Sequence, residues 1–248
     1  MSKVLWKANL ETKLNSNLYR FEKFVSKKYN KKFNKNYEKI LNWSIKNLGD
    51  FWSSIWDYCK VKGIKSNKKI KKSKIFYKNF FLPNSYLNFA QNLLSKKTPS
   101  KAITFLSENG FRKERTWKDL HKNVSKLQFF FNKIKLRNGN RVAAYTINSI
   151  ETVEVFLATT SIGAIWSSCS PDFGVKGVIE RFAQIKPKVL FVTDRYYYNG
   201  KEINILERVP EILKKIKSIK YLIIMNYPGK NFLKKNIKFK RLKVFFWN

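Results

Sequence analysis

The sequence is poor in the residues that build disulfides, zinc sites and histidine-dependent catalytic centres. Its 248 residues include two cysteines, Cys59 and Cys169, and one histidine, His121. Two distant cysteines provide neither a disulfide framework nor a Cys-x-x-Cys motif, and one histidine provides no triad or zinc site. We expect both thiols to be buried and reduced and His121 to lie at the surface of a helix. The sequence predicts no metal ligand.

Glycine-rich phosphate loops and long apolar runs are also missing. The nine glycines form no G-x-G-x-x-G, no G-x-x-x-x-G-K-[ST] and no Ser/Thr/Gly-rich phosphate loop. No catalytic residue is assigned. The sequence contains neither about 18 consecutive apolar residues nor an apolar N-terminal segment. We therefore expect no membrane association and a cytoplasmic protein.

Acidic residues are scarce. There are 16 Asp and Glu against 52 Lys and Arg, which gives a net charge of +36. Such an excess is typical of nucleic-acid binding, but only nine of the basic residues are Arg, the usual reader of base edges. Enrichment in Lys, Asn, Ile, Phe and Tyr favours compositional drift, so we expect no specific nucleic acid. A lysine-rich nucleic-acid-binding protein remains the alternative.

Charge is nearly balanced only in residues 141–200, which carry six basic and five acidic side chains. Apolar runs predict strands, and amphipathic spacing predicts helices between them. The predicted strands are Val142–Ile147, Ala164–Ser168 and Val189–Val192, and the predicted helices are Ser149–Ile162 and Val175–Ile185. Alternation of strand and helix indicates right-handed crossovers and a parallel sheet.

The flanking segments predict further elements. Residues 1–80 are aromatic and helical in pattern, with packing surfaces over 38–58 and a basic loop over 60–78. After these come a hairpin turning at Asn109-Gly110, the helix Trp117–Ile134 capped by Thr116, a turn at 198–201, the helix Ile205–Ile216 and the strand Tyr221–Asn226. Asn148 is the predicted N-cap of the first sheet-covering helix, and the residues after Pro228 are weakly patterned.

An open parallel sheet binds ligands beyond the carboxyl ends of its strands. At one such end, Ser170 and Asp172 precede a helix N-terminus, where unpaired N–H groups favour an anion. The alternative is that Asp172 only caps this helix. The spacing leaves both interpretations open.

A resemblance adds what spacing does not provide. The run Trp-Ser-Ser-Cys-Ser-Pro-Asp-Phe-Gly at 166–174, with Arg181-Phe and Gln184-Ile-Lys-Pro-Lys-Val-Leu190, resembles acetoacetyl-CoA synthetases, which are adenylate-forming acyl-CoA synthetases. Shorter matches spread over nearly the whole chain, such as Trp43-Ser44, Leu87–Leu94 and Tyr198–Lys201. Gln91 departs from the family, which has Glu there.

The resemblance implies a ligase that uses ATP, Mg²⁺ and CoA to activate acetoacetate through an acyl-adenylate. It places six residues beside the CoA nucleotide: Ser170, Asp172, Phe173, Gly174, Tyr198 and Lys201. Lys201 keeps the charge of a family arginine, whereas Tyr198 does not. The family's phosphate loop and catalytic lysine have no counterpart, so we expect the N-terminal fragment of such an enzyme, inactive alone.

The resulting expectation is an α/β fold with a helical N-terminal region over 1–80. Residues 81–248 are expected to form the first βα units of the AMP-binding domain, as an incomplete, mostly parallel sheet. A second chain carrying the C-terminal part would complete the enzyme. A folded remnant without function is a further alternative, and the acyl substrate is not assigned by any residue of the chain.

Overall fold

A computed structural model describes residues 3–233 and 237–247 of the chain. The chain forms two compact units, residues 1–87 and 88–248. The predicted domain boundary after residue 80 stays a prediction.

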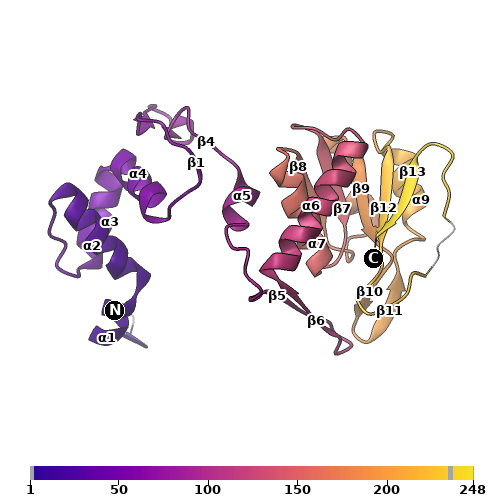
Figure 1. The fold of residues 1–248 in the computed structure, drawn as a ribbon, viewed down its shortest axis with the longest axis horizontal. Helices are drawn as coiled ribbons and strands as arrows, with labels where there is room; N and C mark the ends of the chain where they lie inside the picture. The colour runs from indigo at the N-terminus through magenta and orange to yellow at the C-terminus, as the bar shows by residue number, and fades with distance from the viewer. Residues whose placement is uncertain (1–2, 234–236, 248) are drawn as a thin grey trace. The chain divides into compact units, whose positions relative to one another are not determined.

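The first unit is helical in its first two thirds, as its pattern predicts (Figure 1). Polar residues cap these helices: Asn9, Ser16 and Asn36 each accept a hydrogen bond from a backbone N–H of the first turn. The helices are α1 Leu10–Asn15, α2 Asn17–Tyr29, α3 Tyr37–Lys46 and α4 Leu48–Tyr58.

An aromatic cluster forms the core of this unit. Its buried members are Phe21, Val25, Phe33, Ile40 and Trp43. The prediction that the N-terminal aromatic residues are core is confirmed for Trp43 and wrong for Trp52, which is 41% exposed. The chain turns at Asn47 between α3 and α4, which rotates the face that a continuous helix over 38–58 would have buried.

The basic segment 60–78 is more ordered than a loop. It contains β1 Gly63–Ile64, which pairs with β4 Tyr86–Leu87. It also contains β2 Ile70–Lys71, which pairs with β3 Phe80–Phe81, and the 3-10 helix η1 Phe76–Lys78. The loop prediction is wrong for these residues, because their strands are too short to produce a periodic pattern.

The second unit is built on a five-stranded sheet in the order β13-β12-β9-β7-β8. All four neighbouring pairs are parallel. The strands are β7 Arg141–Tyr145, β8 Ile165–Cys169, β9 Val189–Thr193, β12 Tyr221–Met225 and β13 Lys243–Trp247. The predicted α/β fold with a parallel sheet is confirmed.

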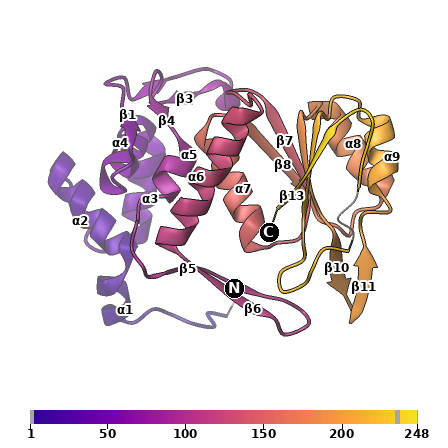
Figure 2. The same ribbon diagram turned by 45° about the vertical axis from the view of Figure 1, so that its right-hand side comes forward.

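Helices cover both faces of the sheet (Figure 2). Leu190 and Phe191 of β9 point to opposite faces and join different apolar clusters. One cluster packs the sheet against α6 Trp117–Lys133 and α7 Ile150–Ser161, and the other against α8 Val175–Ile185 and α9 Val209–Lys215. Burial on both faces explains why the strands read as continuous apolar runs.

Before the sheet, the chain forms the short helix α5 Phe89–Leu93 and the hairpin of β5 Lys101–Leu106 and β6 Arg112–Thr116. Gly110 has φ +79° at the predicted turn, a conformation that glycine adopts without strain. Thr116 caps α6 as predicted, by accepting from the N–H of Asp119. The predicted apolar stripe of α6 is buried: Leu120, Val124, Leu127 and Phe131.

Two local predictions are wrong at element ends, and one segment without a predicted element contains a strand. Ser149, not Asn148, caps α7 by accepting from the N–H of Thr152. The predicted helix over 205–216 begins at Val209, where Pro210 supplies a φ suited to a first turn. The weakly patterned C-terminal segment contains β13, which takes its order from pairing with β12.

Two side chains differ in burial from the expectation. Cys169 is buried as predicted, but Cys59 is exposed because it lies at the C-terminal end of α4. His121 is half-buried rather than at the surface, and its Nε2 is buried without a hydrogen-bond partner among the described residues.

No helix in the described ranges 3–233 and 237–247 is both long and apolar enough to cross a membrane.

Replacing Phe131 with Ala should lower the free energy of unfolding by about 3–5 kcal/mol, because a fully buried ring leaves a cavity. Phe129 of the same helix is the matched control, since it is 64% exposed. Its replacement with Ala should change the free energy by less than about 1 kcal/mol. Urea denaturation followed by circular dichroism measures both, and equal losses would contradict the assigned core face of α6.

Candidate functional site

The carboxyl ends of the parallel strands lie at one edge of the sheet. The segment Ser170–Gly174 follows β8, and a hairpin of β10 Arg195–Tyr198 and β11 Lys201–Asn204 follows β9. This edge is where an open α/β sheet offers a ligand site. Both segments contain residues predicted from the sequence.

The loop Ser170–Gly174 is ordered by its own hydrogen bonds. The Ser170 hydroxyl donates to Oδ2 of Asp172 at 2.7 Å, and the N–H of Phe173 donates to the Ser170 carbonyl at 3.2 Å. Asp172 does not cap α8, so that interpretation is wrong. Gly174 occupies the N-cap position without a side-chain acceptor, and the start of α8 faces solvent with an exposed cap.

Tyr145 and Arg208 hold this loop from beneath. Tyr145 ends β7, and its hydroxyl lies 3.0 Å from the Pro171 carbonyl and 2.6 Å from the Phe173 carbonyl. Nη1 of Arg208, at the N-cap of α9, donates to the Tyr145 hydroxyl at 2.8 Å and to the Pro171 carbonyl at 2.9 Å. Burial raises the pKa of Tyr145 despite the neighbouring Arg208, so the phenol keeps its proton at neutral pH.

Phe173 has a cationic neighbour that the sequence prediction did not include in the site. The guanidinium of Arg181 lies 4.1 Å from the centre of the Phe173 ring, within cation–π range. Arg181 lies on α8, and its Nη1 donates to the Gly177 carbonyl. The only signal for Arg181 in the sequence was its place among the residues that resemble acetoacetyl-CoA synthetases.

Tyr198 and Lys201 face each other at the tip of the β10–β11 hairpin. The turn between them has Asn199 at φ 50° and Gly200 at φ 73°, the conformation expected of Asn-Gly in a two-residue hairpin. Both side chains are exposed, and the hairpin extends past the sheet in Figure 1. Among the described residues no hydrogen bond or ion pair joins this tip to Ser170–Gly174.

Asp194 anchors the base of the same hairpin. This fully buried carboxylate accepts hydrogen bonds from Arg195 at 3.1 Å and from the N–H groups of Tyr227 and Leu233 at 3.0 Å. It therefore fixes the end of β9 to the segment after β12. Its position between Thr193 and Arg195, just after an apolar run, gave no sign of this role.

A cavity of about 300 Å³ near the end of β13 contains two buried carboxylates. Glu151 pairs with Lys113 at 2.7 Å, and Glu154 pairs with Arg115 at 2.7 Å and accepts from Asn123 at 2.8 Å. Oε2 of each glutamate has no hydrogen-bond partner in the described part of the chain. Burial raises the pKa of Glu154 against the opposing effects of Asn123 and Arg115.

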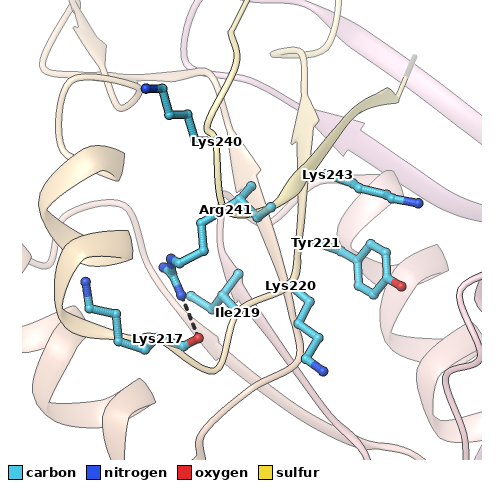
Figure 3. A pocket seen from close by; sticks show the side chains of 8 residues that line it. Lys217, Ile219, Lys220, Tyr221, Lys240, Arg241 and Lys243 are labelled. Atoms are coloured by element: carbon cyan, nitrogen blue, oxygen red, sulfur yellow. Dashed lines mark hydrogen bonds between the residues drawn. The ribbon is translucent and has the colours of Figure 1, made fainter.

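A cationic pocket lies at the opposite end of the sheet, where β12 and β13 begin (Figure 3). Arg241 is fixed there, because its guanidinium donates to the carbonyls of Lys217 and Leu213 at 2.6 Å. The ammonium groups of the four lysines point in different directions in Figure 3 rather than toward one point: Lys217, Lys220, Lys240 and Lys243.

No group of three or more His, Cys, Asp or Glu side chains suited to a metal ion occurs in the part of the chain that the structure describes.

Residues 94–240 match the AMP-binding enzyme family. The chain belongs to this family. The match covers the sheet from its first strand to β12 and includes the loop Ser170–Gly174 and the β10–β11 hairpin.

Relatives of this AMP-binding chain are acyl-CoA synthetases by name. It is 40% identical to the acetoacetyl-coenzyme A synthetase of Rhizobium meliloti (strain 1021) over 73% of its length and 28% of that protein. It is 33% identical to the acetoacetyl-CoA synthetase of Gallus gallus over 91% of its length and 34% of that protein. A malonamoyl-CoA synthetase of Penicillium aethiopicum is 31% identical over 90% and 31% of the two chains. The resemblance noted in the sequence is confirmed.

The fold agrees with these matches. The acetoacetyl-CoA synthetase from Streptomyces lividans superposes with a TM-score of 0.89 at 24% identity, over 99% of this chain and 37% of that one. The chain thus spans about a third of the length of the relatives it matches.

When Glu154 is replaced with Gln, the stability of the variant should rise relative to that of the unmodified protein as the pH rises. The folded-state pKa of Glu154 is raised, so its contribution is complete below the unfolded-state pKa and is lost as the pH rises through the folded-state pKa. For each pH unit by which the folded-state pKa exceeds the unfolded-state pKa, the free energy of unfolding changes by about 1.4 kcal/mol. Melting temperatures measured at increasing pH from about 4.3, the ordinary pKa of Glu, show the change in this difference.

The same substitution at Glu180, an exposed residue of α8, controls for the loss of one carboxylate. A fall in the stability of the Glu154 variant relative to that of the unmodified chain with rising pH would contradict a raised pKa for Glu154.

Proposed function

We propose that the chain is the N-terminal portion of an acid–thiol ligase that converts acetoacetate, ATP and CoA to acetoacetyl-CoA, AMP and pyrophosphate. Membership in the AMP-binding enzyme family supports the ligase class. The names of the relatives support the acid and the thiol.

The reaction has two displacements. A carboxylate oxygen of the acid attacks the α-phosphorus of ATP, and the bond to pyrophosphate breaks. The CoA sulfur then attacks the acyl carbon, the bond to AMP breaks and the thiol proton leaves. The first displacement requires cations around the phosphates. Because the sequence has no phosphate loop, we assign no residue of this chain to it and propose that the chain alone is inactive.

The observation that carries the proposal is the loop Ser170–Gly174 at the carboxyl end of β8. It precedes a helix start without a side-chain cap, and its exposed residues include Asp172 and Phe173. Backbone N–H groups in such a place favour phosphate oxygens. We propose that Ser170, Asp172, Phe173, Gly174, Tyr198 and Lys201 form part of the CoA contact surface.

The proposal for the acid substrate rests on the chemistry shared by the acids in the relatives' names. Acetoacetate and malonamate are both short acids with a carbonyl at C3, as the names of the relatives imply. We propose an acid of this class, with acetoacetate first. A second polypeptide that carries the remaining part would complete the enzyme, and an open reading frame for it directly downstream would support a split gene.

The cationic pocket at the start of β12 and β13 favours one rival function, which is nucleic-acid binding. Its lysines point apart, which suits diffuse attraction to a polyanion better than recognition of a sequence. Binding to duplex DNA that persists at about 200 mM salt would favour the rival, since weak polycation binding is lost by then.

The purified chain should catalyse no exchange of radiolabelled pyrophosphate into ATP, with or without acetoacetate. This follows from the missing phosphate loop. A full-length acetoacetyl-CoA synthetase assayed in parallel is the positive control. Exchange by this chain that depends on acetoacetate would overturn the proposed inactivity.

Replacing Lys201 with Gln should weaken CoA binding about fivefold, the effect of losing roughly 1 kcal/mol from an exposed charge-assisted contact. Lys220, exposed at the amino end of β12, is the matched control and should have no effect when replaced with Gln. Calorimetric titration with CoA and with 3′-dephospho-CoA tells which phosphate is contacted. If both variants lose the same affinity for CoA, the loss comes from net charge alone, and Lys201 is not part of the site.

A further inference from the structure

The loop Ser170–Gly174 is attached to the rest of the unit by two backbone carbonyl groups. The carbonyls of Pro171 and Phe173 point inward, toward the Tyr145 hydroxyl. Pro171 is buried, whereas Ser170, Asp172, Phe173 and Gly174 are exposed. The loop therefore has a bonded inner side and an open outer side.

One proton distribution satisfies three of the four contacts and leaves no proton between the Tyr145 oxygen and the Pro171 carbonyl. A phenol has a single proton, and Nη1 of Arg208 has two. Arg208 donates to the Tyr145 oxygen at 2.8 Å and to the Pro171 carbonyl at 2.9 Å. The phenol proton then goes to the nearer carbonyl, that of Phe173 at 2.6 Å. Arg208 thus bonds the Tyr145 hydroxyl, and this hydroxyl bonds the peptide group between Phe173 and Gly174.

The geometry of the peptide bond also fixes the direction of the N–H groups on the outer side of the loop. In a trans peptide the N–H points opposite to the C=O of the same unit. No cis peptide bond occurs among the described residues. An inward Pro171 carbonyl therefore turns the N–H of Asp172 outward, and an inward Phe173 carbonyl turns the N–H of Gly174 outward. Both donors face away from Tyr145. The N–H of Asp172 donates weakly to the Ser170 hydroxyl at 3.5 Å, so an anion can approach the N–H of Gly174 most directly.

We propose that Tyr145 and Arg208 are positioning residues that hold the Ser170–Gly174 loop with its N–H donors turned toward an anionic ligand. The identity of that ligand as the CoA nucleotide rests on the proposed function. The hold on the loop does not, because it is a property of the unliganded chain. Neither residue touches the ligand in this proposal, and both act through the loop.

Cys169 makes the hold measurable without a ligand. It lies directly before the loop, pairs in register with Tyr145 and is 4% exposed. Cys59 is exposed and reacts with a thiol reagent as an internal reference. Labelling of Cys169 requires local opening, and its rate follows the opening equilibrium.

Tyr145→Phe and Arg208→Gln should each raise the labelling rate of Cys169 about tenfold, the effect of losing one charge-assisted hydrogen bond. The effect of the double variant should be smaller than the product of the two single effects, because both substitutions remove the Arg208–Tyr145 bond, although Arg208 also bonds the Pro171 carbonyl directly. Arg208→Lys should fall between Gln and the unmodified chain. Lys176→Gln is the matched control, since Lys176 is an exposed residue two positions after the loop, and it should leave the rate unchanged.

The inference is wrong if both single variants label Cys169 at the unmodified rate, or if the two effects multiply in the double variant. It is also wrong if each rise in labelling is matched by an equal loss of global stability in urea, because the residues would then support the whole unit rather than the loop.

A second measurement separates this inference from the proposed function. Tyr145→Phe should weaken CoA binding about fivefold or more, while Lys201→Gln, which lies outside the hold, should weaken CoA binding without changing Cys169 labelling. If the unmodified chain does not bind CoA, the proposed CoA contact surface is wrong. The labelling rates would still decide whether Tyr145 and Arg208 position the loop.

Discussion

Backbone pairing of β9 with β7 and β12 is the constraint on which residues 88–248 depend. All five residues of β9 are buried, and successive side chains pack against helices on opposite faces. A strand that is apolar on both faces has no solvent-exposed alternative, which fixes its place at the centre of the sheet. Because its neighbours run parallel to it, the segments that follow three strands meet at one edge.

Tyr145 connects this core to the candidate site. Its ring belongs to the apolar cluster beneath α8 and α9, and its hydroxyl bonds the loop after β8. Because Tyr145 is packed in the core and also bonds the loop, packing of the sheet determines the conformation of the exposed loop Ser170–Gly174. The loop residues themselves need few bonds, since Ser170 and Asp172 bond mainly each other.

Much of this architecture was predictable from local pattern. The strands β7, β9 and β12 and the helices α6, α7 and α8 have continuous apolar runs or clear stripes, and their predicted positions agree with the structure within about two residues, a usual margin for element ends. The strand β13 was missed because its order comes from pairing with β12, which lies elsewhere in the sequence. The cap of α7 was misplaced because Asn148 and Ser149 are similar by propensity and only backbone geometry separates them.

The candidate site was less predictable than the fold. Resemblance supplied the loop and Lys201, but the bond between Arg208 and Tyr145 spans 63 positions of sequence and leaves no periodic trace. The same holds for Asp194, whose partners Tyr227 and Leu233 lie 33 and 39 positions away. Long-range polar contacts are set by topology, so composition and spacing do not reveal them.

The strands β8 and β13 form the two borders of the sheet, and in the described part of the chain no further strand pairs with either. The peptide groups along such borders can recruit strands from neighbouring molecules. A net charge of +36 opposes that recruitment by mutual repulsion, and dissolved ions shorten its reach to about 10 Å at 0.1 M. The lysine excess thus opposes aggregation through these borders, and this protection weakens as the ionic strength of the solution rises.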